Sequence, residues 1–259
     1  MAVDASSDAT LPRERQDRIW ERLRRHGRVI AADLAVEFRV SEDSIRRDLR
    51  ELAARGLCKR VYGGALLMTQ TAPIAQRRGE HVERKRALAA VAASLVSPGQ
   101  ILFIDAGSTN SAIAAALPER QGLTVETNAP DVALALIGRP GIDVLTIGGR
   151  IDPKIGGAVG SMAVRQVQGI RADLCMPGVC AADADTGLWT LDPEEVVLKR
   201  TMIEASGETL LVATREKLLA AATHHTAPAA SITHLVVERG TEPAIIEAWR
   251  AVGTTVHVA

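Results

Sequence analysis

Three arginines, Arg46, Arg47 and Arg50, lie beside a stripe of apolar residues that recurs at helical spacing. Lys59 and Arg60 follow in a short basic segment just before a pair of glycines. Guanidinium and ammonium groups bind DNA phosphates, and an arginine in the major groove bonds bidentately to guanine. The pattern therefore indicates a surface for a polyanion, whereas the same helix in isolation would be interpreted as a solvated basic face.

The neighbouring segments favour the first interpretation. A helix ends at Gly27, AADLAVEFRV predicts a second, shorter helix, and Ser41 is a good N-cap for the arginine-bearing third helix. LCKRVY and ALLM, separated by Gly63 and Gly64, predict two short strands around a turn. Three helices and a hairpin make a winged helix-turn-helix, in which the third helix meets base edges with its N-terminal part. The candidates for the bases are Ser44, Arg46 and Arg47, and those for phosphates are Arg50, Lys59 and Arg60.

A second kind of site is indicated where the apolar run ILFI ends. A loop of small and hydroxyl-bearing residues follows it and precedes a helical segment. Backbone N–H groups and the positive end of the helix dipole attract anions at such a position, although an ordinary helix cap explains the loop equally well. The residues concerned are Asp105, Gly107, Ser108 and Thr109.

Polar groups also follow later apolar runs: Thr127, Asn128, Gly148, Gly149 and Arg150. In open parallel α/β sheets, ligands bind at the carboxyl ends of the strands, so several such loops together favour a small molecule that carries phosphate. Glu195, Lys199 and Lys217 are candidates for the charged groups around it. Taken singly, each of these three is better explained as a surface residue.

Other constellations carry no comparable signal. Cys175 and Cys180 have no histidine at ligand spacing beside them, which argues against zinc. No Ser-His-Asp set has a recognisable local context. We expect no metal, no cofactor and no catalytic residue.

Alternating strand and helix signals fill the rest of the chain. The runs are QILFID, LTVETN, IDVLTIGG, ADLCMPGV, ETLLVA, ITHLVVE and TTVHVA, and most are separated by helical stretches. This alternation predicts an α/β domain with a mainly parallel, buried sheet. We predict a winged helix-turn-helix domain over 11–70, a linker over 71–80 and a larger α/β domain over 81–259.

The charge of the 259 residues is balanced overall, with 31 basic and 31 acidic side chains, but it is unevenly distributed. Residues 11–70 carry a net charge of +5 and residues 71–259 a net charge of −3, as expected when one module binds nucleic acid. MAVDASSDAT lacks the pattern of a secretion signal, no apolar run is long enough to span a membrane, and the three cysteines do not suggest disulfides. We expect a cytoplasmic protein.

Residues 15–67 strongly resemble the N-terminal domain of DeoR-family bacterial transcriptional regulators. The family pattern Ser-x-x-x-Ile-Arg-Arg-Asp-Leu, then a basic strand and Gly-Gly-Ala, is met by Ser41, Ile45, Arg46, Arg47, Asp48, Leu49, Arg60, Gly63, Gly64 and Ala65. Tyr62 stands where the family commonly has histidine. The resemblance implies that the partner is double-stranded operator DNA, and it adds Ser41 and Gly63 to the DNA-binding candidates.

The remainder looks like the DeoR-family sensor domain, which is related in fold to ribose-5-phosphate isomerases and generally senses phosphorylated sugars. The family pattern is met by Asp105, Gly107, Ser108, Thr109, Thr127, Asn128, Gly148, Gly149, Glu195 and Lys199. Where the family reads Ala-Asp-Ser-Ser-Lys, this chain has Ala213 to Lys217, which keeps the lysine and loses the acid. Its usual Thr-Asp appears here as Val237-Glu238, and its Phe-x-Gly as CMPG.

The resemblance implies a DNA-binding regulator of carbohydrate metabolism genes, most often a repressor, controlled by a phosphorylated metabolite and acting as a homo-dimer or homo-tetramer. Two alternatives remain at this point. One is a sugar-phosphate isomerase or transferase with an accessory DNA-binding head, and the other is an architectural DNA-binding protein with an inert C-terminal half.

Overall fold

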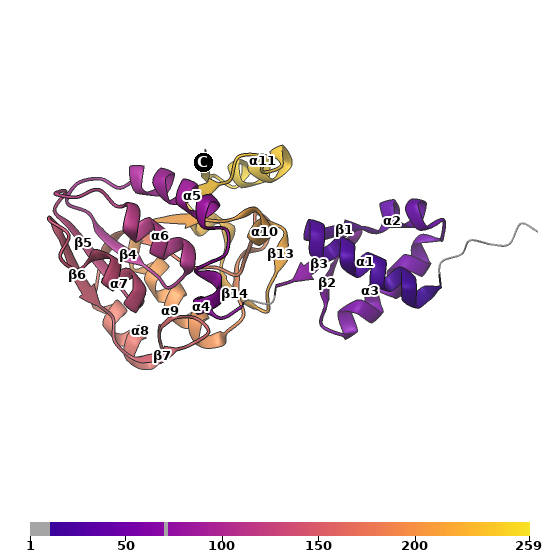
Figure 1. Cartoon of the computed structure of the whole chain (residues 1–259), viewed down its shortest axis with the longest axis horizontal. Helices are drawn as coiled ribbons and strands as arrows, with labels where there is room; N and C mark the ends of the chain where they lie inside the picture. The colour runs from indigo at the N-terminus through magenta and orange to yellow at the C-terminus, as the bar shows by residue number, and fades with distance from the viewer. Residues whose placement is uncertain (1–10, 70–71) are drawn as a thin grey trace, which may run out of the picture. The chain divides into compact units, whose positions relative to one another are not determined.

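A computed structural model describes residues 11–69 and 72–259. The leader MAVDASSDAT and residues 70 and 71, which include the end of the predicted first domain and the start of the predicted linker, lie outside the described residues. The described chain forms two compact units (Figure 1). The first comprises residues 11–69 with 219–221, and the second comprises 72–218 with 222–259.

The first unit contains the three predicted helices and the predicted hairpin. Its elements are α1 (Pro12–His26), β1 (Arg28–Ile30), α2 (Ala31–Phe38), α3 (Glu42–Ala54), β2 (Cys58–Val61), β3 (Gly64–Met68) and β13 (Ala220–Ala221). The hairpin strands β2 and β3 pair antiparallel, and β3 also pairs with β1 and β13. The strands β1 and β13 were not predicted, because segments of three and two residues show no periodicity.

Local sequence sets the ends of these helices. Gly27 ends α1 in the left-handed conformation, with its N–H bonded to the carbonyl of Leu23. The hydroxyl of Ser41 accepts from the N–H of Ser44 and so caps α3. Gly64 is required by a close approach, since a Cβ there would lie 2.0 Å from the carbonyl oxygen of Val29 on the paired strand.

The second unit is built around a parallel sheet of seven strands in the order β16-β15-β12-β9-β4-β5-β6. All seven apolar runs of the sequence are in this sheet, which confirms the predicted fold class. The strands are β4 (Ile101–Ile104), β5 (Leu123–Thr127), β6 (Ile142–Thr146), β9 (Ala172–Met176), β12 (Ser206–Val212), β15 (His234–Val237) and β16 (Thr255–Val258).

Helices cover both faces of this sheet, and alternate residues of each strand face opposite ways. In β4, Leu102 and Ile104 join the core under α5 (Val82–Ser94), α6 (Ser108–Ala116) and α7 (Pro130–Leu136) (Figure 1). Phe103, between them, joins the core on the other face, under α8 (Ser161–Gln168), α9 (Pro193–Glu204) and α11 (Pro243–Ala251). The sheet is therefore buried on both sides, as its near-continuous apolar runs indicated.

Shorter elements complete the second unit. An antiparallel ribbon joins β7 (Arg150–Asp152) to β8 (Gly157–Val159), and a small sheet joins β10 (Ala181–Asp183), β11 (Gly187–Thr190) and β14 (His224–Ala227). One turn of helix, α10 (Arg215–Leu218), follows β12, and the 3-10 turn η1 (Ala229–Ser231) follows β14. None of the described helices is both long and apolar enough to cross a membrane.

The predicted linker contains structure of its own. Within 71–80, the turn of helix α4 (Ile74–Arg77) buries Ile74, whose N–H donates to the carbonyl of Lys154. The lapse in periodicity that indicated a linker reflects the shortness of α4, whose four residues are too few to show a helical repeat.

A buried ion pair holds α3 to α1. The Arg15 Nε lies 2.6 Å from Asp48 Oδ2, with only 9% and 3% of the two side chains exposed. Gln16 Nε2 also donates to Asp48 Oδ1, at 3.2 Å. The aspartate of the arginine motif is thus a packing residue, because removal of one partner from such a pair leaves a buried charge.

We predict that Asp48→Ala lowers the free energy of unfolding of the first unit by about 3–5 kcal/mol. Hydrogen exchange of α1 and α3 peptides in the full chain, read by mass spectrometry, measures the loss. The control is Glu37→Ala, which breaks the more exposed pair with Arg22 and should cost no more than about 1 kcal/mol. Equal protection losses in the two variants would contradict this role for Asp48.

Candidate functional site

The exposed face of α3 carries the predicted arginines. Arg46, Arg47 and Arg50 are all exposed, and Ser44 is half-buried. Arg46 is ion-paired with Glu42 at 2.8 Å and, more loosely, with Asp43 at 3.5 Å. The three guanidinium groups therefore differ in how much charge they present.

The hairpin extends this surface. Arg60 is exposed and Lys59 is half-buried. Gly63 lies at the turn with a φ of 76°, and a Cβ added to it would meet no other atom within 4 Å. An open groove runs between the hairpin and α3, with Arg46 and Arg60 among the residues that line it. Its lining is completed by Ala31, Glu42, Leu49, Val61, Tyr62, Gly63 and Gly64.

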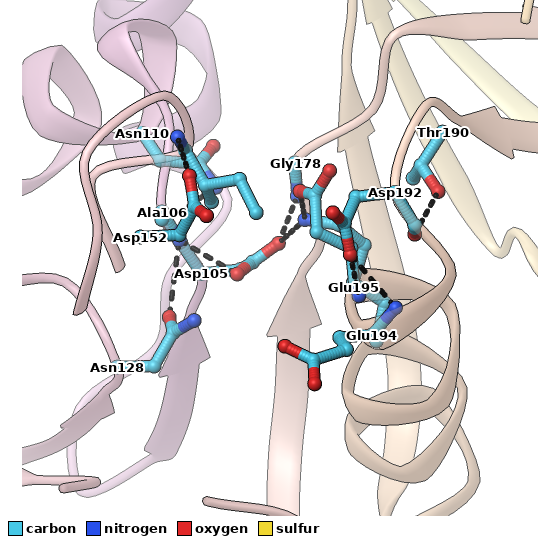
Figure 2. A network of polar contacts seen from close by, with 12 residues as sticks. Asp105, Ala106, Asn110, Asn128, Asp152, Gly178, Thr190, Asp192, Glu194 and Glu195 are labelled. Carbon is cyan, nitrogen blue, oxygen red and sulfur yellow. Dashed lines mark hydrogen bonds and ion pairs between the residues drawn. The ribbon is translucent and has the colours of Figure 1, made fainter. Parts of the chain in front are cut away.

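In the second unit, Asp105 is placed at the carboxyl end of β4 and is 1% exposed. Its carboxylate accepts from the backbone N–H groups of Ala106 and Gly178, at 2.7 and 2.8 Å (Figure 2). Gly178 follows β9, and a Cβ there would lie 2.4 Å from the carbonyl oxygen of Ala106. The loops after two adjacent strands are thereby fixed to one carboxylate.

Lys199, on α9, forms an ion pair with this same Asp105 carboxylate and a second one, at 3.0 Å, with Glu195 one turn earlier. Burial alone would lower the pKa of Lys199, but the two carboxylates outweigh it and raise that pKa above its usual range. Asp192 caps α9 by accepting from the N–H groups of Glu194 and Glu195. The predicted residues Asp105, Glu195 and Lys199 therefore form one buried, mutually satisfied group.

Thr127, the last residue of β5, and Asn128, which follows it, also lie at this edge of the sheet. The hydroxyl of Thr127 donates to the carbonyl of Ile104 at 2.5 Å. The Asn128 side chain accepts from Ala106 N–H at 3.1 Å (Figure 2). It also donates to the carbonyl of Ala158 at 3.1 Å. Both side chains are buried and hold the loops that surround Asp105.

Two cations that the sequence analysis missed lie in this region. Arg77, on α4, donates to the carbonyls of Ala72 and Lys154, and burial lowers its pKa. Lys85, on α5, is 7% exposed and donates to the carbonyl of Arg77, and burial lowers its pKa as well. Lys85 was detectable in principle, since it stands three and four residues before Leu88 and Ala89 on the buried stripe of α5.

Lys217, on α10, is the cation of this group whose charge is least compensated. It is half-buried, and its ammonium has no hydrogen bond or ion pair within residues 11–69 and 72–259. Burial is the largest influence on its pKa, which is lowered to about 8. The attraction of Cys180 opposes this shift, whereas the charges of Arg77, Lys199 and Lys85 add to it.

Not every predicted residue joins the cluster. Gly107, Ser108 and Thr109 begin α6 directly after the Asp105 loop, with Thr109 buried. Gly148 exchanges hydrogen bonds with the side chain of Gln166 on α8, and Gly149 follows it. Arg150 is instead ion-paired with Asp152 and Glu194, with 61% of its side chain exposed.

The electrostatic balance of the cluster favours an anion. Lys199 is neutralised by two carboxylates, whereas Arg77, Lys85 and Lys217 donate only to carbonyls or to no described group. The half-buried Glu80 is the further carboxylate that acts on Arg77 and Lys85. No group of three or more metal-binding side chains occurs in the part of the chain that the structure describes.

Comparison with known proteins identifies the family. Residues 15–71 match the DeoR-like helix-turn-helix domain, and residues 80–239 match the DeoR C-terminal sensor domain. The chain belongs to the DeoR family. The family resemblance of its two segments is thereby confirmed.

Relatives of known role are similar over most of their length. The chain is 33% identical to the glycerol-3-phosphate regulon repressor of Escherichia coli K12, over 79% of this chain and 82% of the relative. It is 30% identical to the transcriptional repressor AccR of Agrobacterium fabrum, over 90% and 92%. Among solved structures, a D-ribose-5-phosphate isomerase in complex with phospho-erythronic acid matches with a TM-score of 0.38 and 14% identity, over 53% of this chain and 54% of that one.

Two residues that depart from the family pattern, Glu216 and Glu238, form ion pairs in the structure. Glu216 and Glu238 both bind Arg84, on α5, at 2.5–2.9 Å. Glu238 also accepts from the N–H of Arg215 at 2.7 Å. These contacts tie the start of α10, the helical turn that carries Lys217, to α5 and to Glu238 after β15.

We predict that Lys217 loses its proton near pH 8, well below the ordinary pKa of a lysine. In protein labelled at lysine side-chain carbons, one of the five lysine signals should titrate near pH 8 by NMR and be absent from Lys217→Arg. The signal of Lys199 serves as the internal control, since its pKa is raised. The absence of any lysine signal that titrates near pH 8 in wild type would contradict the uncompensated environment of Lys217.

Proposed function

We propose that this DeoR-family protein represses carbohydrate metabolism genes by binding operator DNA through α3 and the β2–β3 hairpin, and that a phosphorylated sugar or related metabolite releases it. It acts in the cytoplasm on the chromosome. The observation that carries the regulatory part is the half-buried, uncompensated ammonium of Lys217 among Arg77, Lys85 and Lys199.

The DNA-binding part rests on exposed charge. Arg47 and Arg50 are exposed on α3 and Arg60 is exposed on the hairpin, where it lines the open groove together with Arg46. Side chains in these positions suit phosphate and base contacts of a winged helix-turn-helix. Ser41 has a structural role here as the cap that starts α3.

The effector part rests on an unfavourable arrangement that a ligand would relieve. Burial of the Lys217 ammonium without a matching carboxylate, beside Arg77 and Lys85, costs free energy, and an anion with two negative charges would recover it. A phosphate monoester suits this requirement, because it offers several acceptor oxygens to ammonium and guanidinium groups. Lys199, in contrast, is already neutralised by Asp105 and Glu195 and would serve mainly to hold the loops in place.

Release requires that the effector bind one conformation more tightly than another. A symmetric homo-dimer or homo-tetramer would place two recognition helices at the spacing of two half-sites, and a change in that geometry would weaken DNA binding. The effector domain, from about residue 81 onward, is the part we assign to oligomerisation and sensing.

We predict that Arg47→Ala weakens binding to the DNA upstream of the protein's own gene by at least about 10-fold, because it removes a charged contact. Gel-shift titration measures the change. Arg250→Ala, a similarly exposed arginine on α11, is the matched control and should bind like wild type. Unchanged binding by Arg47→Ala would remove α3 from the interface.

We predict that wild-type affinity falls by about 10³ to 10⁵ between 50 and 200 mM salt if about 6 to 10 phosphates are contacted. The measurement is the same titration at several salt concentrations. An affinity that is nearly independent of salt would exclude a phosphate-contacting interface.

We predict that a sugar phosphate at about 100 times its Kd adds about 2.7 kcal/mol to stability, whereas the same sugar without phosphate adds none. A thermal-shift screen of such pairs measures this. Lys217→Met should abolish the shift while leaving the unliganded protein folded, because the change removes an uncompensated charge. An equal shift in wild type and Lys217→Met would contradict the proposed site, and turnover of a hit would favour the isomerase-like enzyme.

A further inference from the structure

The base-facing candidates on α3 are not equivalent in the free protein. Arg47 is exposed and has no ion pair within the described parts of the chain. Arg46, the adjacent residue, donates through Nη2 to Glu42 at 2.8 Å and through Nη1 towards Asp43 at 3.5 Å. The charge of Arg47 is therefore not offset by a neighbouring carboxylate, whereas Arg46 is paired with carboxylates.

The acidic partners stand where a DNA-binding surface would be expected to avoid negative charge. Glu42 is the first residue of α3, one turn before Arg46, and both line the groove between α3 and the hairpin. Arg60 and Tyr62 line the same groove. A carboxylate beside incoming phosphates lowers affinity for every DNA sequence, so a carboxylate in this groove favours a role in specificity and not in affinity.

We propose that Glu42 is a positioning residue for sequence recognition, which holds the Arg46 guanidinium in a fixed orientation for bidentate bonding to one guanine. This inference rests on the proposed docking of α3 in the major groove. A flexible arginine loses side-chain entropy when it bonds to a base, and an arginine already held by a carboxylate loses less. Each Nη atom carries two hydrogens, so the bonds to Glu42 and Asp43 leave donors for the guanine O6 and N7 acceptors.

The pairing also reduces the contribution of Arg46 to indiscriminate binding. Phosphate contacts carry no sequence information, and a guanidinium neutralised by Glu42 attracts phosphates less than a free one does. Arg47, without such a partner, is the better phosphate contact. The two adjacent arginines would thus have different roles, because Arg46 would discriminate between base pairs and Arg47 would contribute affinity through phosphate contacts.

The test begins with selection of preferred sequences by full-length wild type from a random duplex library. Binding to that sequence and to all single-base-pair variants is then measured for wild type, Arg46→Ala, Glu42→Ala and Glu42→Gln. Arg46→Ala should lose about 5- to 150-fold of discrimination at one G·C pair, which corresponds to about 1–3 kcal/mol. Glu42→Ala should lose several-fold at that same pair while binding a scrambled duplex as tightly as wild type or more tightly.

Glu42→Gln retains an acceptor oxygen at the same reach, so it should recover part of the discrimination. The matched control is Glu83→Ala, which removes the carboxylate from Arg86 in another exposed helical ion pair, on α5, and should leave the selected sequence unchanged. The proposal would be overturned if Glu42→Ala lost affinity equally for all sequences, lost discrimination at a different base pair, or lost no discrimination. It would also be overturned if Arg46→Ala had no effect specific to one base pair. Failure of wild type to select any sequence would instead refute the proposed docking of α3.

Discussion

The ion pairs of Lys199 with Asp105 and Glu195 are the interaction on which the sensor unit depends. A lysine and two carboxylates that are almost completely buried pair with one another, and the backbone N–H groups of Ala106 and Gly178 also donate to Asp105. The group joins the ends of β4 and β9 to α9. In the sequence these residues look like ligand-binding groups, whereas in the structure they bind one another and the loops after β4 and β9.

Lys199 is already paired with two carboxylates, so the positive charge available to a ligand comes from the other cations of this region. Arg77 arrives on α4, Lys85 on α5 and Lys217 on α10, so three separate elements place positive charge around the same strand ends. The Arg84 contacts to Glu216 and Glu238 hold the helical turn that carries Lys217, although the aspartate usual in the family is missing from this segment. Charge that the fold leaves uncompensated is the physical basis of the proposed effector site.

Much of this architecture is predictable from the sequence, for identifiable reasons. The inner strands of the main sheet, such as β4 and β15, are buried on both faces and so appear as short apolar runs, and α3 combines a capping serine with a clean apolar stripe. The ribbon β7–β8 and the strand β1 are too short to show a period, and α4 lies in what looks like a linker. Arg77 and Lys85 were missed because their role depends on contacts between elements that are distant in sequence. Arg150 forms ion pairs with Asp152 and Glu194, and these pairs could not be inferred from spacing.

The most direct test of the central claim is to locate an anion by crystallography. Crystals of the full chain soaked in tungstate, a doubly charged tetrahedral oxyanion, would be measured at the tungsten absorption edge. We predict an anomalous peak within hydrogen-bond reach of Lys217 and Arg77, at the ends of β4 and β9, that is lost in Lys217→Met. A peak confined to other parts of the surface, or a Lys217 ammonium paired with a protein carboxylate, would contradict the account.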